Sequence, residues 1–221
     1  MKKILVTGGA GFIGSALTKV LQQFHYEVFI IDNLSFGRRC SVVIPDAHFF
    51  EVDILNTQAV AEVVNAINPD WVIHLAAIHF IPYCNQHPFE SSKINIQGTL
   101  NVLEALKNTT VQKVLFASTA AVYPISDIPL PEDTPLAPID IYGLSKLTGE
   151  HLLHRFYLET SIPSIVGRFF NAIGPNETNL HLFPSILEQI KAGQRTIKLG
   201  NLSPHRDYIH VQAIAEAVHQ L

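Results

Sequence analysis

The sequence predicts an α/β protein in which a doubly wound parallel sheet is covered by helices on both faces. Short apolar runs of strand length alternate along the 221 residues with longer stretches whose apolar residues recur at helical spacing. The runs are continuously apolar, as is typical of strands that are buried on both faces. Strands that alternate with helices in this way form one parallel sheet, and ligands of such sheets bind beyond the carboxyl ends of the strands.

The order of the elements follows from these patterns. Residues 3–7 are predicted to form the first strand, and a helix begins at Phe12 because the apolar residues that follow it share one helical face. The proline-rich stretch 123–140 is expected to be an ordered loop rather than a domain boundary. Further strands are predicted at residues 26–31, 48–54, 71–77, 113–119 and 164–170, and further helices at 56–67, 90–107 and 139–159.

Three glycines mark the turn between the first strand and the first helix. Gly8, Gly11 and Gly14 stand three residues apart, and glycine turns alone are common in proteins. Their place at a strand-to-helix turn is more informative, because missing side chains let the backbone approach a pyrophosphate. The N-terminus of the helix then offers free N–H groups and partial positive charge to that anion.

A carboxylate ends the second predicted strand. Asp32 follows Gly14 by 18 residues, where it can accept hydrogen bonds from both ribose hydroxyls of an adenosine. It would repel a 2′-phosphate, so NAD is favoured over NADP. The alternatives are that Asp32 is only a turn or cap residue, or that Arg38 and Arg39 in the next loop hold a phosphate. With the glycine turn upstream, Asp32 indicates a Rossmann-type NAD-binding domain.

Composition and charge restrict the class of protein. The chain is 48% hydrophobic and 15% charged, with a formal net charge of −4 and no basic run. Neither nucleic acid nor an anionic membrane is therefore an expected partner. No apolar run approaches the roughly 20 residues of a membrane span. The three apolar residues between Lys3 and Thr7 are too few for an export signal, so the cytoplasm is the expected location.

The cysteines and histidines predict no metal site. Cys40 and Cys84 lack metal-ligand spacing and are expected to be reduced thiols. Among eleven histidines only His151 and His154 form a close helical pair, and no carboxylate or thiol set accompanies them. A solvated helix face explains that pair better than a bound ion.

A tyrosine and a lysine share one face of the helix predicted at residues 139–159. Tyr142 and Lys146 are four positions apart, so their side chains are neighbours. An ammonium beside a phenol favours the phenolate and lowers its pKa, and such a tyrosine can take the proton of an alcohol while hydride leaves the carbon. The pair alone is common on helix surfaces. Behind a dinucleotide-binding turn it predicts an oxidoreductase-type active site.

The chain resembles the extended short-chain dehydrogenases/reductases, and within them the nucleotide-sugar epimerases and dehydratases, with the UDP-glucose 4-epimerases as the nearest members. The resemblance runs over nearly the whole length. It rests on the segments TGGAGFIGS, DNLS, HLAA, NIQGTLNVLEA, STAAVY, YGLSK, RFFNAIGP and HRDYIHV.

The resemblance implies roles for particular residues. Thr119 would hold the reacting sugar oxygen, Tyr142 would be the acid and base, and Lys146 would hold the nicotinamide ribose. The implied substrate is a nucleotide sugar, most simply a UDP-hexose. The residues implied to contact it are His79, Thr119, Asn171 and Arg206. Those implied to bind NAD are Gly8, Gly11, Phe12, Ile13, Gly14, Asp32, Asn33, Asp53, Ile54, Leu75, Ala76, Ala77, Asn95 and Lys146.

Two alanines bear on the reaction. A 4-epimerase oxidises the sugar to a transient ketosugar and returns hydride to the other face, with no further acid or base. A 4,6-dehydratase also needs an acid and a base, which the family's dehydratases carry just after the Thr. Ala120 and Ala121 occupy those positions and transfer no proton. The sequence therefore favours a 4-epimerase over a 4,6-dehydratase or another oxidoreductase of the family.

The chain departs from the family pattern in its second half. Tyr123-Pro124 replaces a Tyr-Gly pair, and Gln212-Ala213 replaces an acidic residue. Family members usually continue well beyond the point where this chain ends. We therefore expect residues 1–170 to form the NAD-binding domain and residues 171–221 an incomplete substrate lobe. The alternative of another class is a catalytically weak NAD-binding sensor or scaffold.

The resemblance also implies a homodimer. Relatives pair through the two long helices that match residues 90–107 and 139–159, and both stretches carry more apolar residues than one core-facing stripe needs. The alternative is that these side chains simply cover the sheet. They are Leu100, Leu103, Leu152, Leu153, Phe156 and Tyr157.

Overall fold

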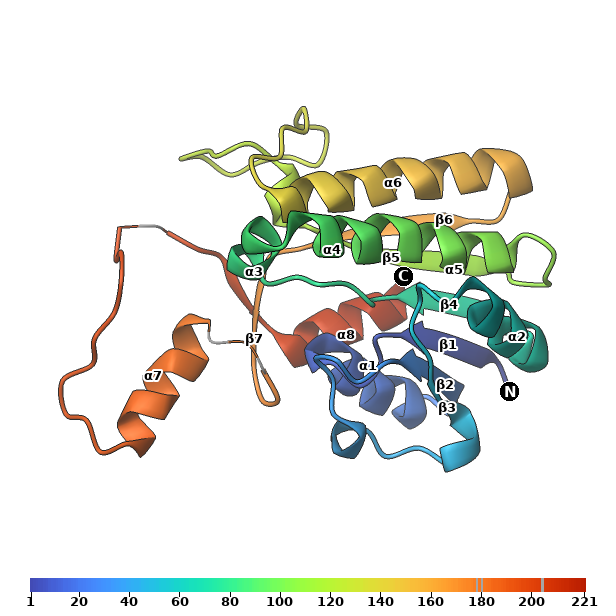
Figure 1. Ribbon diagram of the computed structural model, residues 1–221, viewed down its shortest axis with the longest axis horizontal. Helices are drawn as coiled ribbons and strands as arrows, with labels where there is room; N and C mark the ends of the chain where they lie inside the picture. Colours follow the sequence, from blue (N-terminus) through green and yellow to red (C-terminus); the bar gives the residue numbers. More distant parts are fainter. Residues whose placement is uncertain (178, 180, 204) are drawn as a thin grey trace.

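The computed structural model describes residues 1–177, 179, 181–203 and 205–221 (Figure 1). Its core is a six-stranded sheet in which all neighbouring strands are parallel, in the order β3-β2-β1-β4-β5-β6. This is the strand order of a doubly wound dinucleotide-binding sheet, so the predicted fold class is confirmed. The strands are β1 (Lys3–Thr7), β2 (Glu27–Asp32), β3 (Phe49–Glu51), β4 (Trp71–His74), β5 (Lys113–Thr119) and β6 (Ser164–Phe169).

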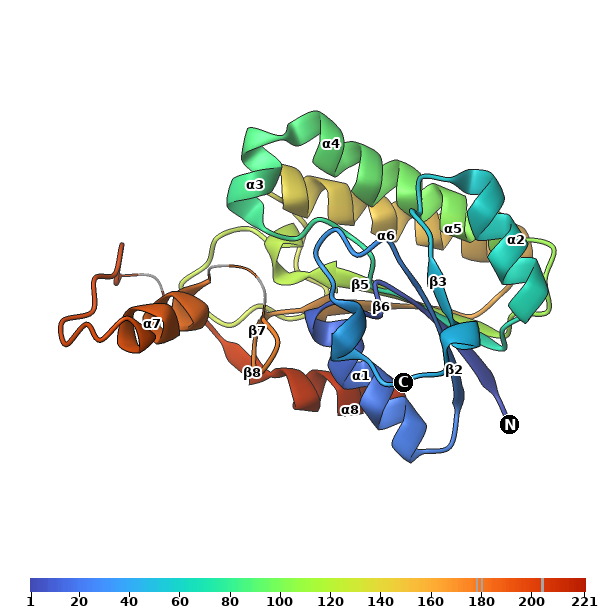
Figure 2. The ribbon, with the colours of Figure 1, turned by 60° about the horizontal axis from the view of Figure 1, so that its bottom comes forward.

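Helices cover both faces of the sheet (Figures 1 and 2). β1 shows why, because Leu5 points into one apolar cluster while Ile4 and Val6 point into the other. The cluster on the Leu5 side is completed by α2 (Thr57–Ile67), α5 (Thr99–Leu106) and α6 (Ile141–Thr160). The cluster on the opposite side is completed by α1 (Phe12–Gln23) and α8 (Val211–Gln220), which pack against each other.

α6 begins and ends at residues whose chemistry suits a helix terminus. Asp140 caps its N-terminus, with Oδ1 accepting a hydrogen bond from the backbone N–H of Gly143 at 2.7 Å. Ser161 ends it in the left-handed conformation, with φ of 59°. Neither α6 nor any other helix in the described part of the chain is both long and apolar enough to cross a membrane.

A second, smaller unit lies beyond the carboxyl edge of the sheet. β7 (Asn171–Ile173) and β8 (Tyr208–His210) form a parallel pair, and between them the chain makes an excursion that includes α7 (Leu182–Lys191). In Figures 1 and 2 this excursion stands apart from the sheet and its helices. After β8 the chain returns to the main body as α8.

Several elements differ from the expectation. The helix expected over residues 90–107 is built from α4 (Pro88–Ser92), a π-helical segment η3 (Lys93–Gly98) and α5, and it is preceded by a separate α3 (Ile81–Gln86). A π-helical segment of six residues is too short for apolar periodicity to reveal it in the sequence. The strand expected at 48–54 is shorter, because β3 begins after η2 (Asp46–His48) and ends at Glu51. The remaining short 3₁₀ segments are η1 (Arg39–Ser41) and η4 (Ala120–Val122).

Candidate active site

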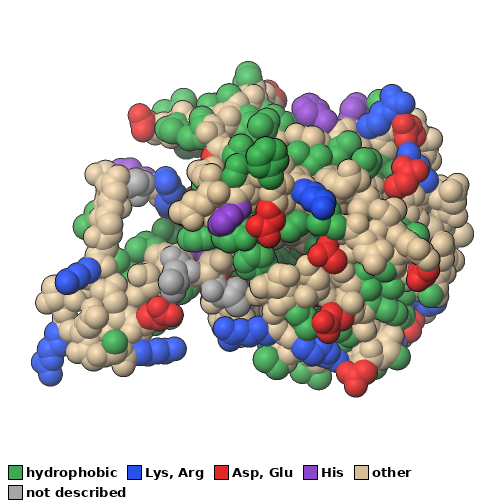
Figure 3. All heavy atoms as spheres, in the orientation of Figure 1, with side chains coloured by type: hydrophobic (Ala, Val, Ile, Leu, Met, Phe, Trp, Pro, Cys, Tyr) green, Lys and Arg blue, Asp and Glu red, His purple; other side chains and the backbone are tan. Residues whose placement is uncertain are grey.

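One large cavity opens at the carboxyl edge of the sheet, with a volume of about 1120 Å³. Residues that follow β1, β2, β4 and β5 line one side of it, and residues from β7 to α7 line the other. Figure 3 shows the molecule hollowed between its main body and the α7 excursion. Every site residue predicted from the sequence lines this cavity except Gly14 and Asn95. Those that line it are Gly8, Gly11, Phe12, Ile13, Asp32, Asn33, Asp53, Ile54, Leu75, Ala76, Ala77, His79, Thr119, Tyr142, Lys146, Asn171 and Arg206.

The glycine turn forms a cradle that side chains would fill. Gly8 has a φ of +72°, and a Cβ there would lie 2.7 Å from the backbone nitrogen of Ala76. Gly14 does not line the cavity. A Cβ on it would come within 2.3 Å of the carbonyl oxygen of Gly8, so this glycine lets the first helix pack closely against the turn. The bare backbone at the start of α1 fits a dinucleotide pyrophosphate.

Asp32 joins the end of β2 to this turn. Its Oδ2 accepts a hydrogen bond from the N–H of Ala10 at 2.9 Å and its Oδ1 accepts one from Leu34 at 2.8 Å. Burial raises the pKa of the carboxyl, and these two hydrogen bonds work against that rise. Each oxygen keeps a further lone pair for a ribose hydroxyl.

The two arginines of the next loop have different surroundings. Arg39 turns away from the cavity, donating to Asp46 at 2.7 Å and lying over the ring of Phe49. Arg38 lines the cavity, so it is the only one of the pair placed to meet a phosphate at the adenosine end.

We expect the chain to bind NAD more tightly than NADP, because a 2′-phosphate would meet the buried carboxylate of Asp32. The difference should be at least about tenfold, as for like charges brought together at a partly buried site. Asp32→Ala should reduce the difference in affinity between NAD and NADP. Arg38→Ala should weaken the binding of NADP without affecting that of NAD. Calorimetric titration of each variant with both dinucleotides measures this. Equal affinity of the unaltered chain for the two would contradict the assignment.

Asn95 supports the cavity wall from behind. It is buried, and its side chain accepts a hydrogen bond from the N–H of Ile78 at 2.8 Å and donates to the carbonyl of the same residue at 2.9 Å. It also donates to Ser145 Oγ at 3.0 Å, which ties the loop after β4 to α6. The structure thus places Asn95 as a residue that positions Ile78 of the cavity wall, without a surface of its own in the cavity.

Asn33 and Asp53 lie together where the adenosine end would bind. Asn33 Nδ2 donates to Asp53 Oδ2 at 3.0 Å, and Asp53 Oδ1 accepts from the N–H of Leu55 at 2.8 Å. This pair encloses the same end of the cavity as Asp32.

Thr119, Tyr142 and Lys146 converge from two elements. Thr119 ends β5, and its hydroxyl is hydrogen-bonded to that of Tyr142 near the start of α6. Lys146, one turn further along α6, is buried, with its Nζ 4.5 Å from the centre of the Phe116 ring. The hydroxyl pair can hold and transfer a proton at the cavity wall.

The pKa of Tyr142 departs from its ordinary value in the opposite direction to the expectation. Burial raises it, the hydrogen bond with Thr119 lowers it, and burial is the larger effect. Burial also lowers the pKa of Lys146 to about 7, so the lysine carries only part of its charge at neutral pH. The sequence correctly predicts that Tyr142 and Lys146 are neighbours on one helix. It does not show that both side chains are removed from water, which is what shifts their pKa values.

We expect the stability of the cofactor-free chain to rise between pH 7 and about 10 because of Lys146. In that range the unfolded chain holds the lysine proton and the folded chain does not, so raising the pH favours the folded state. The slope is at most about 1.4 kcal/mol per pH unit. Lys146→Met should remove it, whereas Lys191→Met at an exposed site should not. Urea unfolding at a series of pH values tests this, and an unchanged slope in Lys146→Met would refute it.

A partly buried ion pair joins β6 to α6, the helix that carries Tyr142 and Lys146. Arg168 of β6 donates from Nε and Nη2 to the two carboxylate oxygens of Glu150 on α6, at 3.0 and 2.8 Å. Glu150 also accepts a hydrogen bond from Ser118, the neighbour of Thr119. Arg168 Nη1 donates to Tyr123 Oη at 2.8 Å and to the carbonyl of Glu132 at 2.9 Å, so it also holds the proline-rich loop.

The other side of the cavity carries charged and polar groups from the second half of the chain. Asn171 lies on β7 and donates to the carbonyl of Asp207 at 3.4 Å, and Arg206 precedes β8. His79 faces them from the loop after β4, and burial, together with the nearby His181, lowers its pKa to about 4. Glu177 lines the same wall and was missed, because no local pattern connects it to His79.

The comparison with protein families gives one match over nearly the whole chain. Residues 4–221 match the family described as the NAD dependent epimerase/dehydratase family. The motifs quoted above and this match cover the same residues, from the first strand to the last helix.

Individual relatives agree with that match. The UDP-glucose 4-epimerase of Corynebacterium glutamicum is 34% identical, over 97% of this chain and 69% of its own length. The structure of Thermus thermophilus UDP-glucose 4-epimerase with NAD superposes with a TM-score of 0.90 and 30% identity, over 99% of this chain and 73% of that one. Thermotoga maritima UDP-glucose 4-epimerase with UDP-glucose gives a TM-score of 0.89 and 31% identity, covering 97% and 71%.

Proposed function

The chain belongs to the NAD dependent epimerase/dehydratase family, and from that premise we propose that it is a nucleotide-sugar 4-epimerase. The observation that carries the proposal is the convergence of Thr119, Tyr142 and Lys146 on the cavity at the carboxyl edge of the sheet. The substrate class follows the relatives that act on or bind UDP-sugars, so a UDP-hexose is the first substrate to test.

Each group of residues in the cavity has a separate role in the proposed reaction. The glycine turn and Asp32 hold NAD, which supplies the hydride acceptor and donor when it is bound. Tyr142 takes the proton from a sugar hydroxyl, and Thr119 holds that oxygen through a hydrogen bond. Lys146 would hold the nicotinamide ribose. After the sugar turns over, Tyr142 returns the proton, so no further acid or base is needed.

Two alanines support epimerisation over dehydration. Ala120 and Ala121 form η4 directly after Thr119, and neither can donate or accept a proton through its side chain. A dehydratase that used this position would need a carboxyl group there. If the chain carries these residues but converts no sugar, it is instead an NAD-binding sensor or scaffold.

A panel of UDP- and GDP-hexoses, incubated with the NAD-loaded chain and followed by proton NMR, tests the proposal. We expect interconversion of one pair of C4 epimers with no net consumption of NAD. A product that has lost a hydroxyl would show that the chain is a dehydratase and not an epimerase. NAD binding without conversion of any sugar in the panel would support the sensor or scaffold.

We also propose a homodimer that pairs through α5 and α6. Half of the apolar set expected at such an interface is core instead, since Leu103, Leu153 and Phe156 are buried against the sheet. Leu100 and Tyr157 remain exposed. Leu158 on α6 is 62% exposed as well, which leaves apolar surface for a second copy to cover.

Light scattering should give a mass of twice 24.5 kDa at micromolar concentration. Leu158→Asp should shift the mass toward the monomer, while Leu187→Asp on α7 should leave it unchanged. A monomer mass for the unaltered chain at every micromolar concentration would rule the dimer out.

The two cysteines support a cytoplasmic location, which we retain as a proposal. Cys40 is exposed and Cys84 is buried, and both are free thiols. Reduced thiols are usual in cytoplasmic enzymes. Fractionation of cells that express the chain tests this, and recovery outside the cytoplasmic fraction would refute it.

A further inference from the structure

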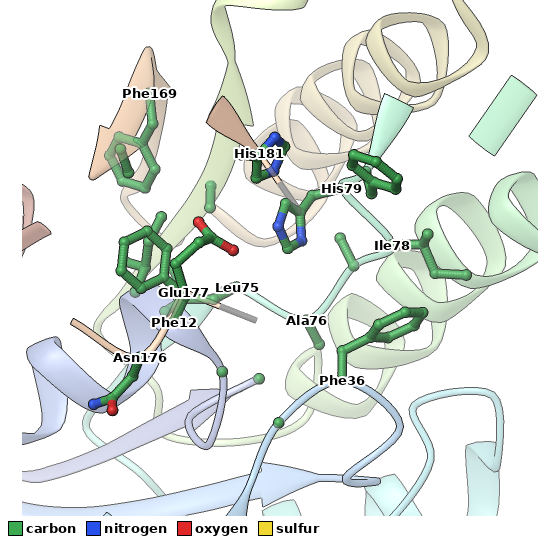
Figure 4. A pocket seen from close by; sticks show the side chains of 18 of the residues that line it. Phe12, Phe36, Leu75, Ala76, Ile78, His79, Phe169, Asn176, Glu177 and His181 are labelled. Carbon is green, nitrogen blue, oxygen red and sulfur yellow. The ribbon is translucent and has the colours of Figure 1, made fainter. Parts of the chain in front are cut away.

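Three side chains that are far apart in the sequence meet on the α7 side of the cavity. His79 follows β4, whereas Glu177 and His181 lie between β7 and α7, about 100 positions later. One ligand atom from each residue lies within 4.8 Å of those of the other two. Figure 4 shows both imidazoles and the carboxylate directed toward a common space.

We propose that His79, Glu177 and His181 form a binding site for a divalent first-row transition-metal ion. Two imidazole nitrogens and one carboxylate oxygen are a ligand set that such ions favour. Three protein ligands leave a coordination position open to the cavity, where water or an oxygen atom of a ligand can enter.

The spacing of the three groups fits an ion better than direct contact. Within the described residues, Glu177 has no hydrogen bond or ion pair with either imidazole, although all three groups converge. Ligands about 2.1 Å from a tetrahedral ion stand roughly 3.4 Å apart. A contraction of about 1.4 Å from the limit of 4.8 Å reaches that spacing, and rotation of the exposed His181 and the half-buried Glu177 side chains supplies it.

Asn179 provides an independent support for two of the ligands. Its backbone N–H donates to Glu177 Oε1 at 3.0 Å, and its side-chain amide lies 2.9 Å from His79 Nε2. With the amide turned so that its oxygen faces the ring, it accepts the proton of Nε2 and leaves Nδ1 to bind the ion, and such hydrogen bonds orient metal-binding imidazoles and carboxylates in their sites. His181 is positioned separately, by the edge of the Phe80 ring at a centroid distance of 5.2 Å.

No pattern in the sequence indicates this cluster. The helical pair His151 and His154 was the only local arrangement of histidines, and it stands alone on α6. His79 and His181 come together only because β7 leads the chain back across the carboxyl edge of the sheet.

Metal binding can be tested without any assay of turnover. The chain, prepared without a histidine tag, is titrated with Zn²⁺ by calorimetry and with Co²⁺ by visible absorption. We expect one equivalent of Zn²⁺ to bind with submicromolar affinity. Glu177→Gln and His181→Gln should each weaken it at least about 100-fold, and Asn179→Ala about tenfold. His181→Cys should retain binding, because a thiolate is also a zinc ligand.

The double variant His151→Gln/His154→Gln is the matched control and should bind Zn²⁺ like the unaltered chain. NAD binding and melting temperature verify that each variant is folded. No binding at 100 μM Zn²⁺, or binding that survives in Glu177→Gln and His181→Gln, would overturn the proposal. Because only metal binding is measured, these outcomes are separate from those that test the epimerase.

Discussion

Replacing Tyr142 by phenylalanine is expected to lower kcat by about 10²–10⁴-fold, the range attributed to a positioned acid or base. The substitution removes one hydroxyl that is hydrogen-bonded to Thr119 and leaves the ring in place. The fold and the affinity for NAD should therefore persist. Steady-state rates on the best sugar of the panel and calorimetric titration with NAD measure the two effects.

The matched control is Tyr157→Phe, which removes the same hydroxyl from an exposed position on the same helix. Its rate should equal that of the unaltered chain. A Tyr142→Phe variant that turns over within threefold of the unaltered chain would exclude Tyr142 as the proton acceptor. Loss of NAD binding in that variant would show that the phenol instead supports the cofactor site.

Arg168→Met should destabilise the fold by on the order of 3–5 kcal/mol, because it leaves the carboxylate of Glu150 buried without its partner. Glu150 is only 8% exposed, and the guanidinium donates two of the hydrogen bonds that its carboxylate accepts. The same change releases Tyr123 and the carbonyl of Glu132. Chemical denaturation of the single variants measures how much unfolding free energy each one loses. The double variant Arg168→Met/Glu150→Leu shows how much of that free energy returns when both charges are removed.

An exposed ion pair on α6 serves as the reference. Arg155 contacts Glu159 at 2.6 Å, but the arginine side chain is 71% exposed. Arg155→Met should therefore change the unfolding free energy by less than about 1 kcal/mol. If Arg168→Met lowers the free energy of unfolding by no more than Arg155→Met does, the Arg168–Glu150 pair does not hold β5, β6 and α6 together.

Most of the residues proposed to bind the nucleotide could be placed together at the cavity from the sequence, because their signals are local. Gly8, Gly11 and Gly14 occur within one turn, and Asp32 ends the strand that follows. In a parallel sheet the carboxyl ends of the strands meet at one edge, so strand-end residues converge without further information. The spacing of Tyr142 and Lys146 is likewise set by a single helix.

The rest of the site depends on contacts between distant segments. Asn95 was expected to meet the cofactor, but its side chain is taken up by Ile78 and Ser145, which the sequence does not place beside it. Glu177 and His181 become neighbours of His79 only through the β7–β8 pair. The pKa of Tyr142 depends on burial, and burial is a property of the packed molecule rather than of residue spacing.

The β7–β8 pair has a consequence for how this fold can vary. Asn171 pairs with Tyr208 and Ile173 with His210, so both ends of the excursion are pinned at adjacent strands while α8 packs on α1 behind them. Doubling the length of a loop with fixed ends adds only about 0.6 kcal/mol to its closure entropy. Residues 174–207 therefore form a module that evolution or a protein engineer can lengthen, shorten or exchange while the sheet and its glycine turn stay as they are. Replacing this one segment can change which ligands the cavity binds, with no change to Thr119, Tyr142 or Lys146.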